Sequence, residues 1–329
     1  MSEAVILDVS DLCVEFDTEE GRVRAVDEVG FQLKKGRTLG IAGESGCGKT
    51  ITALSIMRLL PKPVSMISRG RAFFQGQDLL NLSKQQMHHI RGRKISMIFQ
   101  EPMTALNPVH SIGKQVIEIQ QIHFPGLSHS SMAKISVAML DKVGISDPET
   151  VMKKYPHQLS GGMRQRVMIA MSIACRPDIL IADEPTTALD VTVQAQILDL
   201  IGTLKQESGM SVILITHDLG VIAENCDDIA VMYAGKIVEK AGVLDLFKHP
   251  LHPYTKGLLS SIPSLAEHPK TFLPTIPGNV PSLMDMPAGY RFQDRCPLVA
   301  DICRNKDPEE RIMDENHVLR CHMADKQGL

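Results

Sequence analysis

The stretch of sequence that decides the fold is Gly43-Glu44-Ser45-Gly46-Cys47-Gly48-Lys49-Thr50. It follows an apolar segment at 38–42 that is typical of a buried strand, and it opens a segment predicted to be helical to about residue 60. Glycines let backbone N–H groups turn inward around a phosphate, and a helix N-terminus adds a favourable dipole. The spacing predicts a phosphate loop in which Lys49 contacts the β- and γ-phosphates of a nucleotide and Thr50 ligates magnesium.

A second apolar segment, at 179–182, ends in Asp183 and Glu184. Carboxylates at the C-terminal end of a buried strand lie at the ligand-binding edge of a parallel sheet. Asp183 suits magnesium coordination, and Glu184 points to the other side of the strand, where it can polarise an attacking water. Solvated acids at a strand end are the ordinary alternative, but the phosphate loop upstream favours a catalytic pair.

A third segment, Ser160-Gly161-Gly162, precedes a run at 163–175 that is predicted to be helical. A serine N-cap followed by two glycines leaves N–H groups exposed at a helix start, which is a second anion site. One triphosphate rarely needs two such sites, so this one is expected to bind a nucleotide held by another subunit. Taken alone, the segment is better interpreted as an ordinary helix cap.

Composition and charge limit the classes of protein that this chain can belong to. The 329 residues are 43% hydrophobic and 22% charged, with a net charge of −3, so no global field recruits nucleic acid. No apolar run approaches the roughly 18 residues of a membrane span, and no signal peptide is expected. Seven cysteines in a chain of this length favour the cytosol over a secreted disulfide scaffold.

Strand and helix signals alternate from residue 160 to the mid-230s, which predicts an α/β fold with a mostly parallel sheet and helices on both faces. Residues 1–40 are predicted to form short strands joined by turns, and 108–155 is helical and rich in methionine. Beyond about residue 245 prolines become frequent. We therefore expect a nucleotide-binding domain at 1–245 and a C-terminal extension at 246–329.

The segment Leu159–Arg166 resembles the signature motif of ATP-binding-cassette (ABC) ATPases, and the resemblance covers residues 5–245. It implies a P-loop NTPase fold with an N-terminal antiparallel β subdomain, a mostly parallel core sheet and a helical subdomain at about 101–165. It also implies that ATP and Mg²⁺ bind where two cassettes meet.

The resemblance further implies a role for residues that the local patterns leave open. Phe16 matches the aromatic position that stacks on adenine, where the family often has Tyr. Gln100 matches the glutamine that senses the γ-phosphate and joins Thr50 and Asp183 at magnesium. His217 matches the switch histidine, and residues 187–190 match the loop that contacts the partner cassette, with Thr187 where Ser is usual.

Residues 100–108, 156–158 and 252–255 resemble the peptide-importer branch of this family, and 53–61 resembles its D-type ATPase subunit. That resemblance implies a second, F-type ATPase subunit, two transmembrane permease subunits, an extracytoplasmic solute-binding protein, and a peripheral position on the cytoplasmic face of the inner membrane. Peptides are the expected cargo, with nickel, glutathione or another small solute as alternatives. A soluble, non-transport cassette ATPase is the remaining alternative.

Three cysteines in the extension raise the question of a metal cluster. Cysteine thiolates bind soft metal ions and iron–sulfur clusters, and the extension contains Cys296, Cys303 and Cys321. Some D-type relatives hold a [4Fe–4S] cluster on four cysteines, and Tyr290 stands where the first of them would be. Either His317 or His322 would supply the fourth ligand, or the site is degenerate and the thiols are free.

Overall fold

The computed structural model describes residues 4–101, 105–187, 189–262, 274–314 and 316–324. The chain forms two compact units. Unit 1 contains residues 1–81 and 214–329, and unit 2 contains residues 82–213. The division falls inside strand β8 (Ser211–Thr216).

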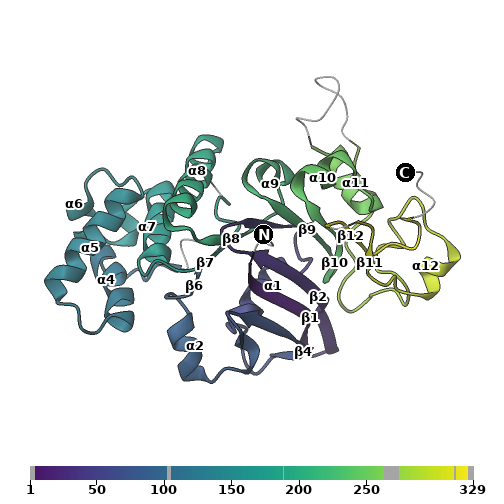
Figure 1. Ribbon diagram of the computed structural model, residues 1–329, viewed down its shortest axis with the longest axis horizontal. Coiled ribbons are helices and arrows are strands. Elements are labelled where there is room, and N and C mark those ends of the chain that lie inside the picture. Colours follow the sequence, from purple (N-terminus) through teal and green to yellow (C-terminus); the bar gives the residue numbers. More distant parts are fainter. Residues whose placement is uncertain (1–3, 102–104, 188, 263–273, 315, 325–329) are drawn as a thin grey trace. The chain divides into compact units, whose positions relative to one another are not determined.

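An antiparallel sheet in unit 1 has the strand order β2-β1-β4-β5 (Figure 1). Its two longest strands, β1 and β2, have 14 residues each, so the prediction of short strands in this segment was wrong. The register between them shifts around Leu12, and each bulge interrupts the alternation of apolar and polar residues. A continuous strand therefore looks like several short ones in the sequence. The strands are β1 (Val5–Thr18), β2 (Gly21–Lys34), β4 (Ser65–Phe74) and β5 (Gln77–Asp78).

A second group of strands in unit 1 carries the phosphate loop. Strand β3 (Thr38–Ala42) is buried throughout and pairs in parallel with β9 (Asp228–Tyr233). Strand β10 (Lys236–Gly242) is antiparallel to β9. Helix α1 (Lys49–Ile56) begins at the lysine of the loop, and α9 (Leu219–Asn225) lies between β8 and β9 in the chain.

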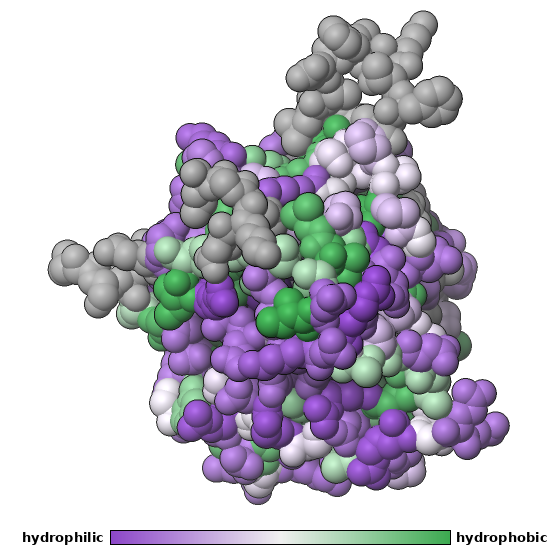
Figure 2. Space-filling model, turned by 90° about the vertical axis from the view of Figure 1, so that its right-hand side faces the viewer, coloured by the Kyte–Doolittle hydropathy of each residue, from purple (hydrophilic) through white to green (hydrophobic). Residues whose placement is uncertain are grey.

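The C-terminal extension completes the sheet and the core of unit 1. Strand β12 (Val318–Leu319) pairs with β10, and β11 (Arg311–Ile312) pairs with β12. The buried aromatic rings of Tyr254, Tyr290 and Phe292 pack with Tyr233 of β9 in one apolar cluster. The side of the molecule that carries the extension is predominantly hydrophilic, with small hydrophobic groups between the polar residues (Figure 2). The helices here are α10 (Val243–Lys248), α11 (Pro253–Ser260) and α12 (Asp301–Asn305).

Unit 2 is mainly helical around one parallel strand pair. Strands β6 (Ile95–Ile98) and β7 (Ile179–Asp183) pair in parallel register. Helices α4, α5 and α6 confirm the helical prediction for 108–155; α4 and α5 lie beside α7, and α6 packs on α4 and α5 (Figure 1). Among the described residues, none of the helices has both the length and the apolar character needed to cross a bilayer. The helices are α2 (Lys84–Ile90), α4 (Ile112–His123), α5 (His129–Lys142), α6 (Pro148–Lys153), α7 (Gly161–Ile173) and α8 (Val191–Ser208).

Candidate nucleotide site

The phosphate loop connects the end of β3 to the start of α1 in unit 1. Lys49 is the first residue of α1, and its side chain is buried. Its Nζ donates to the carbonyl oxygens of Gly43 (2.8 Å) and Glu44 (3.0 Å). Loop carbonyls therefore hold the ammonium group at the helix N-terminus, where the helix dipole also favours an anion. The predicted order of strand, loop and helix is confirmed, and the contact of Lys49 with phosphates stays a prediction.

Close backbone packing explains why glycine occupies two positions of the loop. Gly43 has φ +150°, and a Cβ there would lie 2.1 Å from the carbonyl oxygen of Met232. Gly48 has φ +105°, and a Cβ there would lie 2.9 Å from the carbonyl oxygen of Ala25. Both distances are too short for any side chain. Gly46, at φ +78°, has no atom within 4 Å of such a Cβ, so only its dihedral angle favours glycine.

Cys47 occupies a buried position within the loop. Burial raises the pKa of its thiol, which keeps the side chain neutral. The backbone N–H of Gly235 donates to the Cys47 carbonyl oxygen at 2.8 Å. The turn between β9 and β10 thus supports the loop through its backbone.

The acidic pair lies at the end of β7 in unit 2. Asp183 is the last residue of the strand and is buried. Glu184 follows with φ +44°, a conformation that costs a non-glycine residue about 1–2 kcal/mol. Its Oε2 accepts hydrogen bonds from Gln100 Nε2 (3.1 Å) and Thr187 Oγ1 (2.9 Å). The structure therefore brings together Gln100 and Glu184, which are 84 positions apart in the sequence.

The signature segment forms the start of α7. Ser160 is the N-cap, and its Oγ accepts a hydrogen bond from the Met163 backbone N–H at 3.3 Å. One turn further along, Gln165 Nε2 donates to the Pro185 carbonyl oxygen at 2.5 Å. This bond ties α7 to the segment that carries Glu184. The glycines Gly161 and Gly162 form the first turn of the helix, as predicted.

The remaining candidate residues belong to unit 1. His217 is exposed and directly follows β8, and Asp218 beside it caps α9. Phe16 is half-buried on β1, opposite Val23 of β2. Gln100, the acidic pair and the signature segment belong to unit 2, whereas the phosphate loop, Phe16 and His217 belong to unit 1. Of the loop that is expected to contact a partner cassette, residue 188 lies outside the described residues.

Two contacts to the phosphate loop come from the extension and were missed by the sequence prediction. Arg295 forms an ion pair with the Glu44 carboxylate, and Tyr254 Oη accepts a hydrogen bond from the Glu44 backbone N–H. Tyr254 falls within the stretch 252–255 that resembles the peptide-importer branch, and Arg295 directly precedes Cys296. The resemblance to the peptide-importer branch did not predict that the extension contacts the phosphate loop.

The extension cysteines do not form a four-ligand metal site. Tyr290, which stands where the first cysteine would be, accepts a hydrogen bond at Oη from His252 Nε2 (2.5 Å). Of the two candidate fourth ligands, His317 contacts Glu239 Oε1 through Nε2 (2.7 Å), and His322 contacts the Lys306 carbonyl oxygen. Within the described residues, no group of three or more His, Cys, Asp or Glu side chains is arranged to hold a metal. The residues therefore do not fit a [4Fe–4S] cluster.

The three thiols of the extension lie largely out of contact with water. Cys303 and Cys321 are buried and Cys296 is half-buried. Burial raises the pKa of Cys296, and it raises the pKa of Cys321 to about 11. In the absence of a metal ion, Cys296 and Cys321 are therefore neutral thiols.

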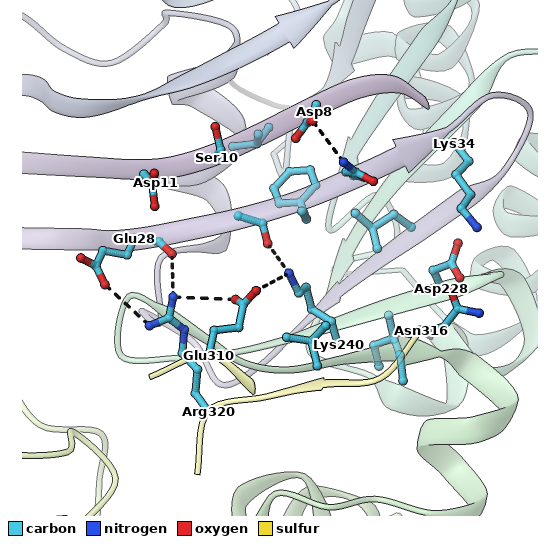
Figure 3. Close-up of a pocket in the computed structure, with 18 residues that line it drawn as sticks. Asp8, Ser10, Asp11, Glu28, Lys34, Asp228, Lys240, Glu310, Asn316 and Arg320 are labelled. Carbon is cyan, nitrogen blue, oxygen red and sulfur yellow. Dashed lines mark hydrogen bonds and ion pairs between the residues drawn. The ribbon is translucent and has the colours of Figure 1, made fainter. Parts of the chain in front are cut away.

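A separate cavity of about 510 Å³ lies between the antiparallel sheet and the extension in unit 1. Figure 3 shows Arg320 beside Glu28 and Glu310, with Lys240 next to Glu310. Five acidic and three basic side chains line the cavity, and this excess of negative charge disfavours a phosphate group. The acids are Asp8, Asp11, Glu28, Asp228 and Glu310, and the bases are Lys34, Lys240 and Arg320.

Comparison with known proteins extends these observations over the whole chain. The ABC transporter family model matches residues 26–187, and the model for the C-terminal region of oligopeptide/dipeptide transporters matches residues 238–303. The chain is 51% identical to a probable peptide ABC transporter ATP-binding protein of Sinorhizobium fredii, covering 96% of this chain and 94% of that protein. It is 49% identical to the dipeptide transport ATP-binding protein of Bacillus subtilis, covering 98% and 96%.

Solved structures show the same fold. A dimeric ATP-binding cassette in a post-hydrolysis state, bound to ADP and Pi, has a TM-score of 0.65 and 26% identity, and covers 72% of this chain and 98% of that chain. A cassette from a cbiONQ transporter of Clostridium perfringens has a TM-score of 0.63 and 26% identity.

The fold and the phosphate loop define a P-loop ATPase of the cassette type. The chain belongs to the ABC transporter family, as an ATP-binding subunit that hydrolyses ATP. The predicted family and fold class are confirmed.

Proposed function

We propose that this protein is the ATPase subunit of a peptide importer, and that it uses ATP hydrolysis to drive uptake of di- or oligopeptides. The observation that carries the proposal is the identity of about half of all residues to peptide-transport ATP-binding proteins over more than 90% of each chain. The match of residues 238–303 to the oligopeptide/dipeptide transporter C-terminal region supports the same cargo class. In this proposal, residues 1–245 are the ATPase domain and 246–329 the extension.

Each candidate residue receives a role in hydrolysis. Lys49 and the loop N–H groups bind the β- and γ-phosphates, and Phe16 stacks on the adenine. Thr50, Gln100 and Asp183 hold Mg²⁺, which neutralises charge on the phosphates. Glu184 accepts a proton from the attacking water, and its hydrogen bonds from Gln100 and Thr187 orient the carboxylate for that step. His217 contacts the γ-phosphate.

The assembly that we propose contains a second cassette. Ser160, Gly161 and Gly162 cap the ATP bound by that partner, an F-type subunit, because exposed N–H groups at the start of α7 suit a phosphate. A solved cassette of the same fold is a dimer, which supports this arrangement. Two permease subunits anchor the pair at the cytoplasmic face of the inner membrane, and an extracytoplasmic solute-binding protein delivers the peptide.

We infer that the extension works without an iron–sulfur cluster. The support is that Tyr290, which has no thiolate, stands at the position of the first cysteine, and that no group of three or more His, Cys, Asp or Glu among the described residues is arranged to hold a metal. Anaerobically purified full-length protein is expected to be colourless and free of iron. A brown preparation with absorbance near 400 nm and stoichiometric iron would contradict this inference.

The transport proposal is tested in proteoliposomes. The protein is purified together with the two permeases and the second ATPase of its neighbouring genes. The solute-binding protein is then added with one candidate cargo at a time: a labelled dipeptide, a labelled pentapeptide, nickel or glutathione. We expect ATP-dependent uptake of at least one peptide and stimulation of ATP hydrolysis by the loaded binding protein. Uptake of nickel or glutathione alone would overturn the peptide assignment. Hydrolysis that needs no permease would favour a soluble cassette ATPase.

A further inference from the structure

Arg295, in the C-terminal extension, makes a bidentate ion pair with Glu44 of the phosphate loop. Its Nη1 lies 2.6 Å from Glu44 Oε2, and its Nη2 lies 3.0 Å from Oε1. Of the Arg295 side chain 5% is exposed, whereas 32% of the Glu44 side chain is exposed, so water screens the pair in part. Hydrogen bonding to Glu44 raises the pKa of Arg295 further above its ordinary value.

The surroundings of Arg295 fix its orientation. Nε donates to the Pro277 carbonyl oxygen at 2.9 Å, and the guanidinium lies over the Tyr233 ring, 5.6 Å from its centroid. An arginine held by a carbonyl and an aromatic face loses little further entropy when it binds a carboxylate. Arg295 is therefore a preorganised support and not a mobile surface charge.

Tyr254 holds the same loop residue by its backbone. Its Oη accepts the Glu44 N–H at 3.0 Å, and the ring is fully buried against Tyr233 and Phe292. The carbonyl oxygen of Glu44 in turn accepts Lys49 Nζ at 3.0 Å. The extension thus binds the carboxylate and the backbone N–H of Glu44, and Lys49 binds its carbonyl oxygen.

The extension also supports the loop from a second direction. Arg291 donates through Nη1 to the Ala234 carbonyl oxygen and through Nη2 to Asp27 Oδ2 (2.6 Å). The next residue after Ala234, Gly235, donates its N–H to the carbonyl of Cys47 in the loop. The phosphate loop is therefore hydrogen-bonded to the turn between β9 and β10, and Arg291 of the extension is hydrogen-bonded to the same turn.

We propose that Arg295 is a positioning residue for nucleotide binding. By holding Glu44, it keeps Lys49 and the loop N–H groups in the geometry that receives the phosphates of MgATP, so the extension sets the affinity of the site. The inference rests on the assignment of the phosphate loop as the nucleotide site. Arg295 itself does not touch the nucleotide.

The test uses the full-length chain and four variants: Arg295→Ala, Arg295→Lys, Glu44→Gln and the double variant Arg295→Ala/Glu44→Gln. The matched control is Arg304→Ala, which removes an exposed arginine of the same extension. Calorimetric titration gives the Kd for MgATP, and steady-state hydrolysis in the transporter complex gives KM and kcat. Thermal melting of each variant reports folding separately.

We expect Arg295→Ala and Glu44→Gln each to raise Kd and KM about tenfold with little change in kcat. The double variant should be no worse than either single one, because both remove the same ion pair. Arg295→Lys keeps the positive charge but cannot form the bidentate pair, so its Kd and KM should lie between those of the wild type and Arg295→Ala.

The outcomes separate this inference from the proposed function. Unchanged Kd in a folded Arg295→Ala or Arg295→Lys variant, or additive losses in the double variant, would overturn the positioning role. A melting temperature that falls while Kd stays constant would assign Arg295 to stability alone. Wild-type protein that fails to bind MgATP would instead overturn the nucleotide site.

Discussion

At the scale of single residues, Glu184 is the group whose chemistry the site depends on most. It has a strained φ of +44°, and two hydrogen bonds orient its carboxylate. Replacing Glu184 with Gln removes the base but keeps the side-chain volume. Because a general base contributes about 10²–10⁴-fold, hydrolysis should fall by that factor while ATP binding persists. Hydrolysis assays and ATP titration measure the two effects.

The matched control for this prediction is Glu118→Gln, an exposed glutamate on α4 of the same unit. It should hydrolyse ATP at the wild-type rate. A Glu184→Gln variant that turns over as fast as the control would rule out Glu184 as the base.

Two glycines of the phosphate loop differ in what constrains them. Gly43→Ala places a Cβ 2.1 Å from the Met232 carbonyl oxygen, so the loop or β9 must move. A Cβ at position 46 has no atom within 4 Å, so Gly46→Ala should cost only the free energy of a positive φ, about 1–2 kcal/mol. We expect Gly43→Ala to lose MgATP binding and to melt well below Gly46→Ala. Equal melting temperatures for the two variants would contradict the close packing of the loop on β9.

At the scale of elements, His252 links helix α11 to the rest of the extension. Its Nδ1 accepts the Tyr254 backbone N–H at 3.0 Å, so in the neutral ring the proton is on Nε2, which donates to Tyr290 Oη. Complete burial lowers the pKa of His252 to about 4, against the opposing effect of the Glu239 charge. The folded protein therefore favours the neutral imidazole.

This shift predicts how stability depends on pH. Between pH 6.5 and about pH 4 the unfolded chain binds a proton on this ring that the folded chain excludes. The contribution of His252 is fully present above pH 6.5 and is lost as the pH falls to about 4, a change of about 3 kcal/mol. Denaturant unfolding at several pH values measures it. His252→Gln should flatten the profile, and a variant with the wild-type slope would show that another group is responsible.

At the scale of the whole molecule, the extension is part of the core of unit 1 and not an appendage. Phe292 is buried and makes edge contacts with Tyr233 of β9 and Tyr254 of α11, at centroid distances of 5.1 Å and 5.4 Å. Phe292→Ala should lower the free energy of unfolding by about 3–5 kcal/mol. Ile312→Ala, on an exposed residue of β11, should change it by less than about 0.5 kcal/mol.

Chemical denaturation followed by circular dichroism measures this difference. Because Phe292 packs on strands of the ATPase core, its loss should shift the unfolding of unit 1 as one transition. A separate early transition that leaves the nucleotide site folded would show that the extension unfolds independently.

Local chemistry was readable from the sequence by itself. The phosphate loop, the acidic strand end at Asp183 and Glu184, and the helix cap at Ser160 each depend on a few consecutive residues. Their place at a strand end or a helix start is set by the local backbone, so residue type and spacing predict it, whereas contacts such as Gln100 to Glu184 come from distant segments. The same locality explains why the strand predicted at 179–182 matches β7 within one residue and why the helical character of 108–155 was predicted.

Only the tertiary structure decided how distant segments meet. Arg295 reaches Glu44 across 251 positions, and no periodicity or motif encodes such a pairing. Tyr290 Oη lies 2.5 Å from His252 Nε2, and His317 Nε2 lies 2.7 Å from Glu239 Oε1, and no local pattern in the sequence predicts either contact. Burial of these polar groups in a shared core demands a partner for each, and folding alone determines which partner is near.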